Sequence, residues 1–133
     1  MIYFIFTRKE EKMINSIDEY IEASPEAGKE WLKEFLKYMN EKYPEYNLIM
    51  FRQCPMYKFG KSYLEGYVMF TTTKKQFALH ILDFEMIEEM KKKISKAEYG
   101  KGCIKVKYDQ VESKPVLKEI IDRVMIKAKS IKK

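Results

Sequence analysis

The sequence has few of the residues that mark catalytic or metal centres. It contains two cysteines, Cys54 and Cys103, and one histidine, His80. The cysteines lie far apart and fit no CxxC or Cys/His spacing, so we expect reduced thiols in a reducing compartment and no structural zinc site. A cysteine nucleophile would need His80 beside it, and nothing in the sequence predicts that pairing.

Catalytic motifs are missing as well. The sequence has no Gly-rich phosphate loop, no GxSxG and no HExxH, so phosphoryl, acyl and zinc hydrolase chemistry lack their starting residues. We therefore predict a protein that is not an enzyme and has no catalytic residues. Nucleic acid is not a predicted partner, because no DNA- or RNA-binding motif is present.

No long apolar run, linker or repeat interrupts the chain. The opening stretch MIYFIFT is far short of the roughly 20 residues that span a bilayer, and it lacks the features of a complete signal peptide. We predict a cytoplasmic protein without a membrane partner. Residues 13–133 are enough for a single domain with one core, whereas residues 1–12 are either an N-terminal extension or an edge strand.

The net charge of +6 is unevenly distributed. Residues 1–90 are slightly acidic, whereas residues 91–133 contain a large excess of lysine. This asymmetry indicates either an anionic partner or, in a lysine-rich composition, a solvated surface.

Two helix starts lie in the N-terminal part. An S-x-x-E capping box begins at Ser16 and predicts a short helix over residues 16–22. Ser24 then precedes Pro25, a residue type favoured at the first helical position, and this pair predicts a helix that stops at Tyr43-Pro44. The apolar arc of the second helix predicts a core-facing side made of Ala27, Trp31, Leu32, Phe35, Leu36, Tyr38, Met39 and Tyr43.

Residues 47–84 are dense in aromatic and β-branched residues, a composition typical of strands. Pro55 cannot donate a ladder hydrogen bond, so we expect it at a bulge or at an edge. Gly60-Lys61 and Thr73-Lys74-Lys75 are expected to close hairpins, and such short connections predict antiparallel neighbours.

The C-terminal part returns to helical periodicity around residues 85–93. Ile104, Val106 and Tyr108 then alternate with lysines and predict a half-buried strand, and a last amphipathic helix is expected from Ser113. The sequence thus predicts an α+β fold, in which an antiparallel sheet is packed on one face by N- and C-terminal helices.

Several segments follow one another in a characteristic order: IDEYIEASPE, a helix that ends in YP, FRQCPMYKF, FTTTKKQFALHIL, the KGCIKVKY strand and the VLKEIIDRVMIKA helix. In this order and spacing they resemble the YdhG-like domain family, whose founding members are described as frataxin-like bacterial iron chaperones. The resemblance implies a frataxin-like arrangement of helices on one face of an antiparallel sheet. Where family members often carry an aromatic, a small residue and Met before the proline, this chain has Arg52, Gln53 and Cys54.

For function, the resemblance implies weak, transient binding of iron and its delivery to an acceptor protein. In frataxins, iron is associated with an acidic ridge along the first helix, and hard carboxylate oxygens on an exposed face can hold and release iron. The corresponding metal candidates are Asp18, Glu19, Glu22 and Glu26. Another interpretation stays open, because Glu26, Glu30 and Glu34 each precede a lysine by three residues, and such pairs stabilise a solvated helix.

A second hypothesis is a binding module that uses a sheet face for an anionic or planar ligand or a partner protein. Aromatic side chains bordered by positive charge are suited to stacking and to anion contact. The candidate ligand-binding residues are Arg52, Tyr57, Tyr63, Tyr67, Lys105 and Lys107. In the alternative interpretation, the tyrosines cover a second core layer beneath the helix around Glu85.

Overall fold

The structure of the protein is a computed structural model that describes residues 16–59, 66–91, 93–94 and 96–131. The predicted edge strand in residues 1–12, the predicted turn at Gly60-Lys61 and Tyr63 lie outside these residues. The described helices are α1 (Ile17–Ala23), α2 (Glu26–Lys42), α3 (Phe84–Met90) and α4 (Lys114–Ile131), with a 3-10 turn, η3 (Val111–Ser113), before α4. The strands are β1 (Leu48–Phe51), β2 (Cys54–Lys58), β3 (Tyr67–Thr72), β4 (Gln76–Ile81), β5 (Glu98–Tyr99) and β6 (Cys103–Lys107).

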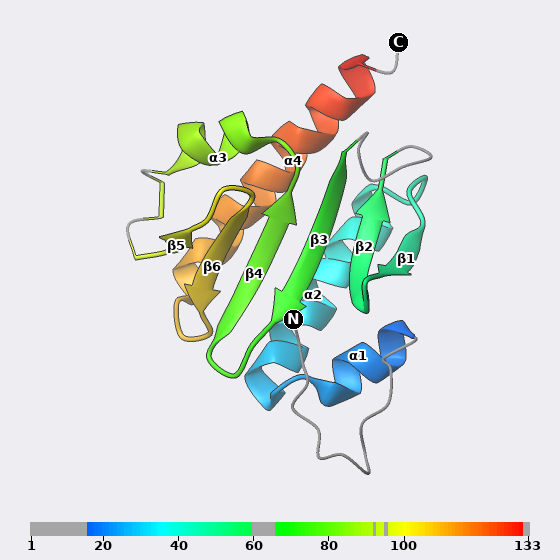
Figure 1. The fold of residues 1–133 in the computed structure, drawn as a ribbon, viewed down its shortest axis with the longest axis vertical. Helices are drawn as coiled ribbons and strands as arrows, with labels where there is room; N and C mark the ends of the chain where they lie inside the picture. The colour runs from blue at the N-terminus through cyan, green and yellow to red at the C-terminus, as the bar shows by residue number, and fades with distance from the viewer. Residues whose placement is uncertain (1–15, 60–65, 92, 95, 132–133) are drawn as a thin grey trace.

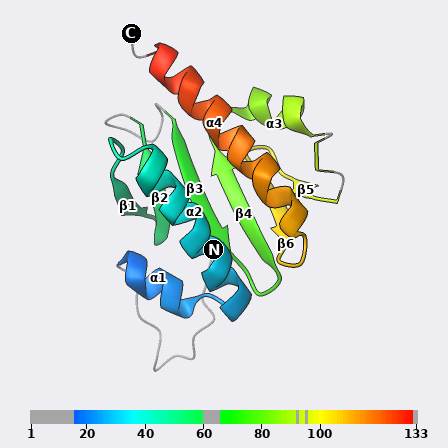
Figure 2. The same ribbon diagram turned by 180° about the vertical axis from the view of Figure 1, so that it is seen from behind.

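The strands form one sheet in the order β1-β2-β3-β4-β6-β5, and all neighbouring pairs are antiparallel. Helices α2 and α4 lie across one face of this sheet, as Figures 1 and 2 show from its two sides. Helix α1 lies near one end of β2, and α3 packs beside α4. This arrangement confirms the predicted α+β fold class.

The core lies between this face and the two long helices. The rings of Phe35 on α2, Phe70 on β3 and Phe77 on β4 form its centre, with ring centroids 4.8 to 5.7 Å apart, and all three side chains are fully buried. The predicted stripe of the last helix is confirmed for its described side chains, since Leu117, Ile120, Ile121, Val124 and Met125 are buried. Burying such large apolar side chains on both layers is the main stabilising contribution to the fold.

The N-terminal helices begin partly as predicted. The Ser16 side chain accepts a hydrogen bond from the Glu19 amide at 3.1 Å, which confirms the predicted cap. The predicted cap at Ser24 is wrong, because Pro25 is the N-cap of α2 and the Ser24 hydroxyl instead bonds to the Tyr20 carbonyl at 2.9 Å. The hydroxyl also bonds to Thr72 Oγ1 of β3, so a tertiary contact outcompetes the local cap. Ala27, placed on the apolar arc, is exposed.

The segment FRQCPMYKF forms a hairpin that the sequence did not predict. Arg52 and Gln53 have φ values of 50° and 67° and form a two-residue turn between β1 and β2. Two successive positive φ values are the signature of a type I′ turn, the geometry that matches strand twist. Pro55 lies in an inner strand, which corrects the expected edge or bulge. It is tolerated there because it pairs only with Met50 of β1, whereas pairing with β3 begins at Met56.

The C-terminal elements agree with the prediction except in detail. Strand β6 covers residues 103–107, and α4 begins at Lys114 after the 3-10 turn. The two-residue strand β5 was not predicted, because it is too short to show a pattern. Tyr108 follows the strand, and its hydroxyl donates to the Thr73 carbonyl at 2.6 Å.

Candidate functional site

The candidate site lies on the sheet face opposite to α2 and α4, called the second face below. Side chains alternate along a strand, so the neighbours of the buried Val68, Phe70, Phe77, Leu79, Ile104 and Val106 point to this face. They are Tyr67, Met69, Thr71, Gln76, Ala78, His80, Cys103, Lys105 and Lys107. Most of them are half-buried, Ala78 is buried and Lys107 is exposed.

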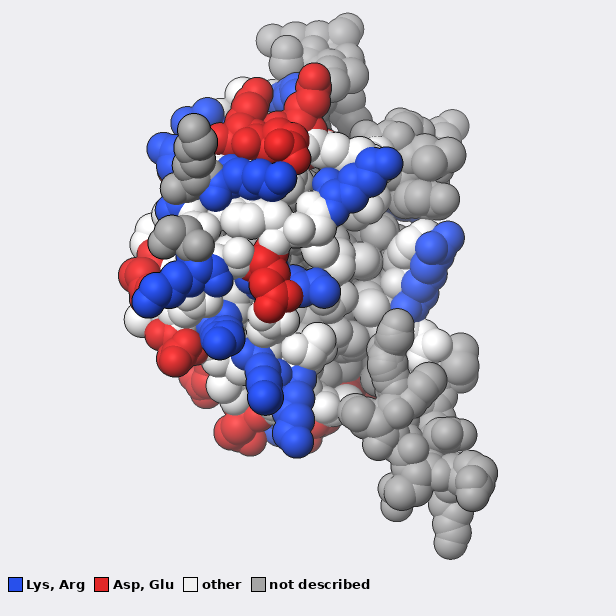
Figure 3. All heavy atoms as spheres, turned by 60° about the vertical axis from the view of Figure 1, so that its left-hand side comes forward, with Lys and Arg blue, Asp and Glu red and all other residues white. Residues whose placement is uncertain are grey.

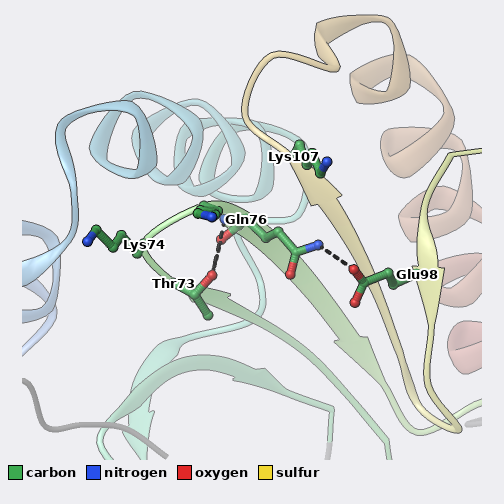
Figure 4. Close-up of a pocket in the computed structure, with 6 residues that line it drawn as sticks. Thr73, Lys74, Gln76, Glu98 and Lys107 are labelled. Atoms are coloured by element: carbon green, nitrogen blue, oxygen red, sulfur yellow. Dashed lines mark hydrogen bonds between the residues drawn. The ribbon is translucent and has the colours of Figure 1, made fainter.

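A pocket opens where the β3–β4 hairpin meets β5 and β6, and it is called the hairpin pocket below. Its volume is about 400 Å³, and it is lined by Thr73, Lys74, Lys75, Gln76, Glu98 and Lys107. Figure 4 shows these side chains around the hairpin turn, with Gln76 and Glu98 bonded across the strand that carries Lys107. All six lining residues are polar or charged types, and they include three lysines and one carboxylate.

The hairpin that carries the pocket is well supported. The Thr73 amide donates to the Gln76 carbonyl at 2.8 Å, and the Gln76 amide donates back to the Thr73 hydroxyl at 3.1 Å. The Gln76 side-chain amide donates to Glu98 Oε2 at 3.1 Å. These bonds hold the two lysines of the turn, Lys74 and Lys75, on a fixed backbone.

A second set of bonds ties the end of β3 to the N-terminal helices. The Thr72 amide donates to the Tyr20 hydroxyl at 3.1 Å, and the Thr72 hydroxyl bonds to Ser24 Oγ at 2.7 Å. Burial is the main cause that raises the pKa of Tyr20 to about 12. The phenol therefore stays neutral and keeps its role in this network at physiological pH.

The hairpin pocket has an unbalanced positive charge. No carboxylate in the described part of the chain lies within 4.0 Å of the ammonium groups of Lys74, Lys75 or Lys107. Figure 3 shows lysine and arginine side chains spread over this side of the molecule, with one cluster of acidic side chains at the top and further acidic side chains at the centre, the left and the bottom. An anion that approaches the pocket is attracted by several lysines at once.

A second cluster on this face surrounds His80. Its Nε2 atom and Thr71 Oγ1 are 2.8 Å apart, and its partner in strand register on β6 is Cys103. Burial, with a smaller contribution from the positive charge of Lys105, lowers the pKa of His80 to about 4. The imidazole is therefore neutral at physiological pH. The register thus brings a cysteine beside the single histidine, a pairing that the sequence did not predict.

The predicted aromatic platform is only partly assembled. The placement of Tyr57 on this face is wrong, because its side chain is fully buried under α2, where its hydroxyl donates to Asn40 Oδ1 at 2.8 Å. Arg52 lies at the β1–β2 turn, near the opposite edge of the sheet from β6. Tyr67, Lys105 and Lys107 do lie on the second face.

Helix α3 does not form a layer over the second face. It contacts α4 and lies beside that helix in both ribbon views. The alternative interpretation, in which Tyr67 lies beneath the helix around Glu85, is therefore wrong. Helix α3 instead lies on the side of α4.

The predicted metal candidates lie on α1 and at the start of α2. Asp18, Glu19, Glu22 and Glu26 are all exposed. The Lys29 ammonium lies 3.8 Å from Glu22 and 3.7 Å from Glu26, so a lysine stands between these two carboxylates. Among the described residues, no three His, Cys, Asp or Glu side chains are grouped so that they could hold a metal ion.

Sequence reasoning missed most of the hairpin pocket. Of its lining residues only Lys107 was a candidate, whereas Thr73, Lys74 and Lys75 were expected only to close a hairpin. The adjacent lysines in a turn were the available signal, since a turn presents both to solvent. Glu98 gave no signal, because β5 itself was not predicted.

Comparisons with known proteins bear on the fold. No family model and no curated protein matches this sequence. Among solved structures, the chain is similar to the crystal structure of a DUF1801-family protein, YdhG, from Bacillus subtilis, with a TM-score of 0.65 and 19% sequence identity. The match covers 79% of this chain and 84% of that protein. At this identity the similarity shows a shared fold, and it confirms the predicted YdhG-like architecture.

None of the helices in the described residues has the length and apolar character needed to cross a membrane.

Proposed function

We propose that the protein is a non-enzymatic binding module that holds an anionic group of a ligand or partner protein at the hairpin pocket. The observation that supports this function is the pocket of about 400 Å³ whose lining contains three lysines, Lys74, Lys75 and Lys107, and one carboxylate, Glu98. A carboxylate or phosphate is the matching chemistry, because ammonium groups donate charge-assisted hydrogen bonds to such oxygens.

The position of the pocket also suits a binding module. Lys74 and Lys75 lie on a hairpin whose backbone is held by Thr73 and Gln76, and the Tyr108 hydroxyl donates to the Thr73 carbonyl at 2.6 Å. A preorganised loop loses less conformational freedom on binding than a mobile one. Glu98, the one carboxylate among the lining residues, accepts a hydrogen bond from the Gln76 side-chain amide.

The test is a titration of the whole chain with inorganic pyrophosphate and, separately, with a short poly-glutamate peptide, followed by amide NMR shifts. We expect shifts at residues 73–76 and at Lys107, with an affinity that falls as salt is raised. The variant K74E/K75E/K107E should lose these shifts. A matched control, K33E/K37E/K93E, reverses as many exposed lysines elsewhere. Equal losses in the two variants would refute a defined site, and so would the absence of shifts in the unmodified protein.

A second proposal is weak binding of ferrous iron for delivery to an acceptor protein, as the family resemblance implies. The supporting observation is that Asp18, Glu19, Glu22 and Glu26 are all exposed and offer hard oxygen ligands. Lys29 competes with a cation for two of them. Removing that ammonium should therefore strengthen iron binding.

Anaerobic calorimetry with ferrous iron tests this second proposal. The variant D18A/E19A/E22A should lose the binding heat, and K29A should bind more tightly than the unmodified chain. If no heat is seen, or if both variants behave like the unmodified chain, iron is not held at these carboxylates.

A further inference from the structure

The backbones of His80 and Cys103 form one of the closely spaced pairs of the antiparallel ladder. The Ile81 amide donates to the Gly102 carbonyl at 2.9 Å, so Ile81 and Gly102 form a hydrogen-bonded pair. Such pairs alternate with non-hydrogen-bonded ones, and His80 with Cys103 is the next pair along the ladder. In a non-hydrogen-bonded pair the Cα atoms are only about 4.5 Å apart.

The Met69 thioether lies on the other side of His80, on β3. Met69 of β3 is the register partner of His80, and alternation places it on the second face together with Cys103. A thioether, an imidazole and a thiol therefore lie in a row across β3, β4 and β6. All three side chains are half-buried, so each keeps some contact with solvent.

We propose that His80 and Cys103 form a binding site for a soft monovalent metal ion, Cu(I), with the Met69 thioether as a weaker third ligand. Thiolate and thioether sulfur select Cu(I), and imidazole also binds copper. Among the described residues no third His, Cys, Asp or Glu side chain joins the pair, so these residues do not supply the four protein ligands of a usual zinc site.

The histidine is held in a state that suits a ligand. Its Nε2 atom bonds to Thr71 Oγ1 at 2.8 Å, which leaves Nδ1 for a metal ion. A ligating histidine commonly donates its other ring N–H to such a partner, and this bond sets its orientation.

The Cys103 thiol points toward Gly100 and away from His80. Its Sγ atom lies beside Gly100, where an added Cβ would be only 2.8 Å away, on the side of β6 that faces β5. Metal binding requires the thiol to turn about χ1 toward β4 and His80. This rotation moves one side chain and leaves the strands in place.

The experiment is anaerobic competition for Cu(I) between the whole chain and a coloured Cu(I) chelator, with the ultraviolet band of a copper–thiolate bond as a second readout. We expect one bound Cu(I) per chain, together with that band. The variants C103S and H80Q should each weaken binding by at least about tenfold, and C103S should abolish the band. The variant M69L should weaken Cu(I) binding less than C103S or H80Q does.

The matched control is C54S, since Cys54 is also half-buried but lies on β2, separated from β4 by β3. It should bind Cu(I) like the unmodified chain, as should K74E/K75E/K107E, because the proposed site does not depend on anion binding at the hairpin pocket. The inference is overturned if the unmodified chain does not compete for Cu(I), or if C103S, shown to be folded by circular dichroism, binds as well as C54S.

Discussion

The carboxylate of Asp122 on α4 links this helix to the C-terminal end of α2. It accepts hydrogen bonds from the Tyr43 hydroxyl at 2.6 Å, from the Tyr38 hydroxyl at 2.8 Å and from the Lys42 ammonium at 3.0 Å. Tyr43 is buried, whereas Lys42 is half-exposed. Replacing Asp122 by alanine removes all three bonds at once.

The expected cost follows from the surroundings of each donor. A hydrogen bond to a charged group contributes about 1.5–3 kcal/mol, and the short bond from buried Tyr43 belongs in this range. The bond from Lys42 is exposed, and pairs of that kind contribute at most about 1 kcal/mol. We therefore expect Asp122→Ala to lower the free energy of unfolding by about 2–4 kcal/mol, with most of the loss tied to Tyr43.

Urea unfolding of D122A, Y43F and the double variant measures this contribution. The double-mutant cycle should give a coupling energy of about 1–2 kcal/mol between the two side chains. The control is E119A on the same helix, where Glu119 pairs with Arg123 four residues later and should contribute at most about 0.5 kcal/mol. If D122A costs no more than E119A, or if the cycle shows no coupling, the proposed role of Asp122 is wrong.

Three further predictions concern the turn, the acid stability and a close helix contact. Gln53→Gly should raise the free energy of unfolding by about 1 kcal/mol, and the urea midpoint with it, because a φ of 67° strains any residue with a Cβ; a lower midpoint would contradict this. Burial alone would raise the pKa of Asp122, but its hydrogen bonds outweigh burial and lower it. Stability should therefore be lost as pH falls below about 3.8, the unfolded value, and urea midpoints of D122N should show a shallower loss. Gly28→Ala should destabilise the fold despite the better helix propensity, since its Cβ would lie 2.8 Å from the Tyr108 hydroxyl and 3.2 Å from Thr72; an unchanged unfolding curve would show that Tyr108 moves freely.

Features that depend on a few neighbouring residues could be predicted from the sequence. The cap at Ser16, the apolar stripe of α4, the hairpin at residues 73–75 and the alternation of β6 are all of this kind. Each depends on capping bonds or on the periods of 3.6 and 2, which act over one or two turns of chain. They were enough for the fold class.

The candidate sites depend on contacts that are distant in the sequence, and only the tertiary structure decided them. Tyr57 faces the core because its strand must supply an apolar side chain beneath α2, and Ser24 gives up its cap for a bond to Thr72. Glu98 joins the hairpin pocket, and Cys103 comes beside His80, only through the register of β6. By itself the sequence determined the helices and the strand-rich segments, though not β5 or the β1–β2 turn, since those preferences are local. Register and burial come from packing the whole sheet against its helices, so the grouping of side chains into sites appears only with the folded chain.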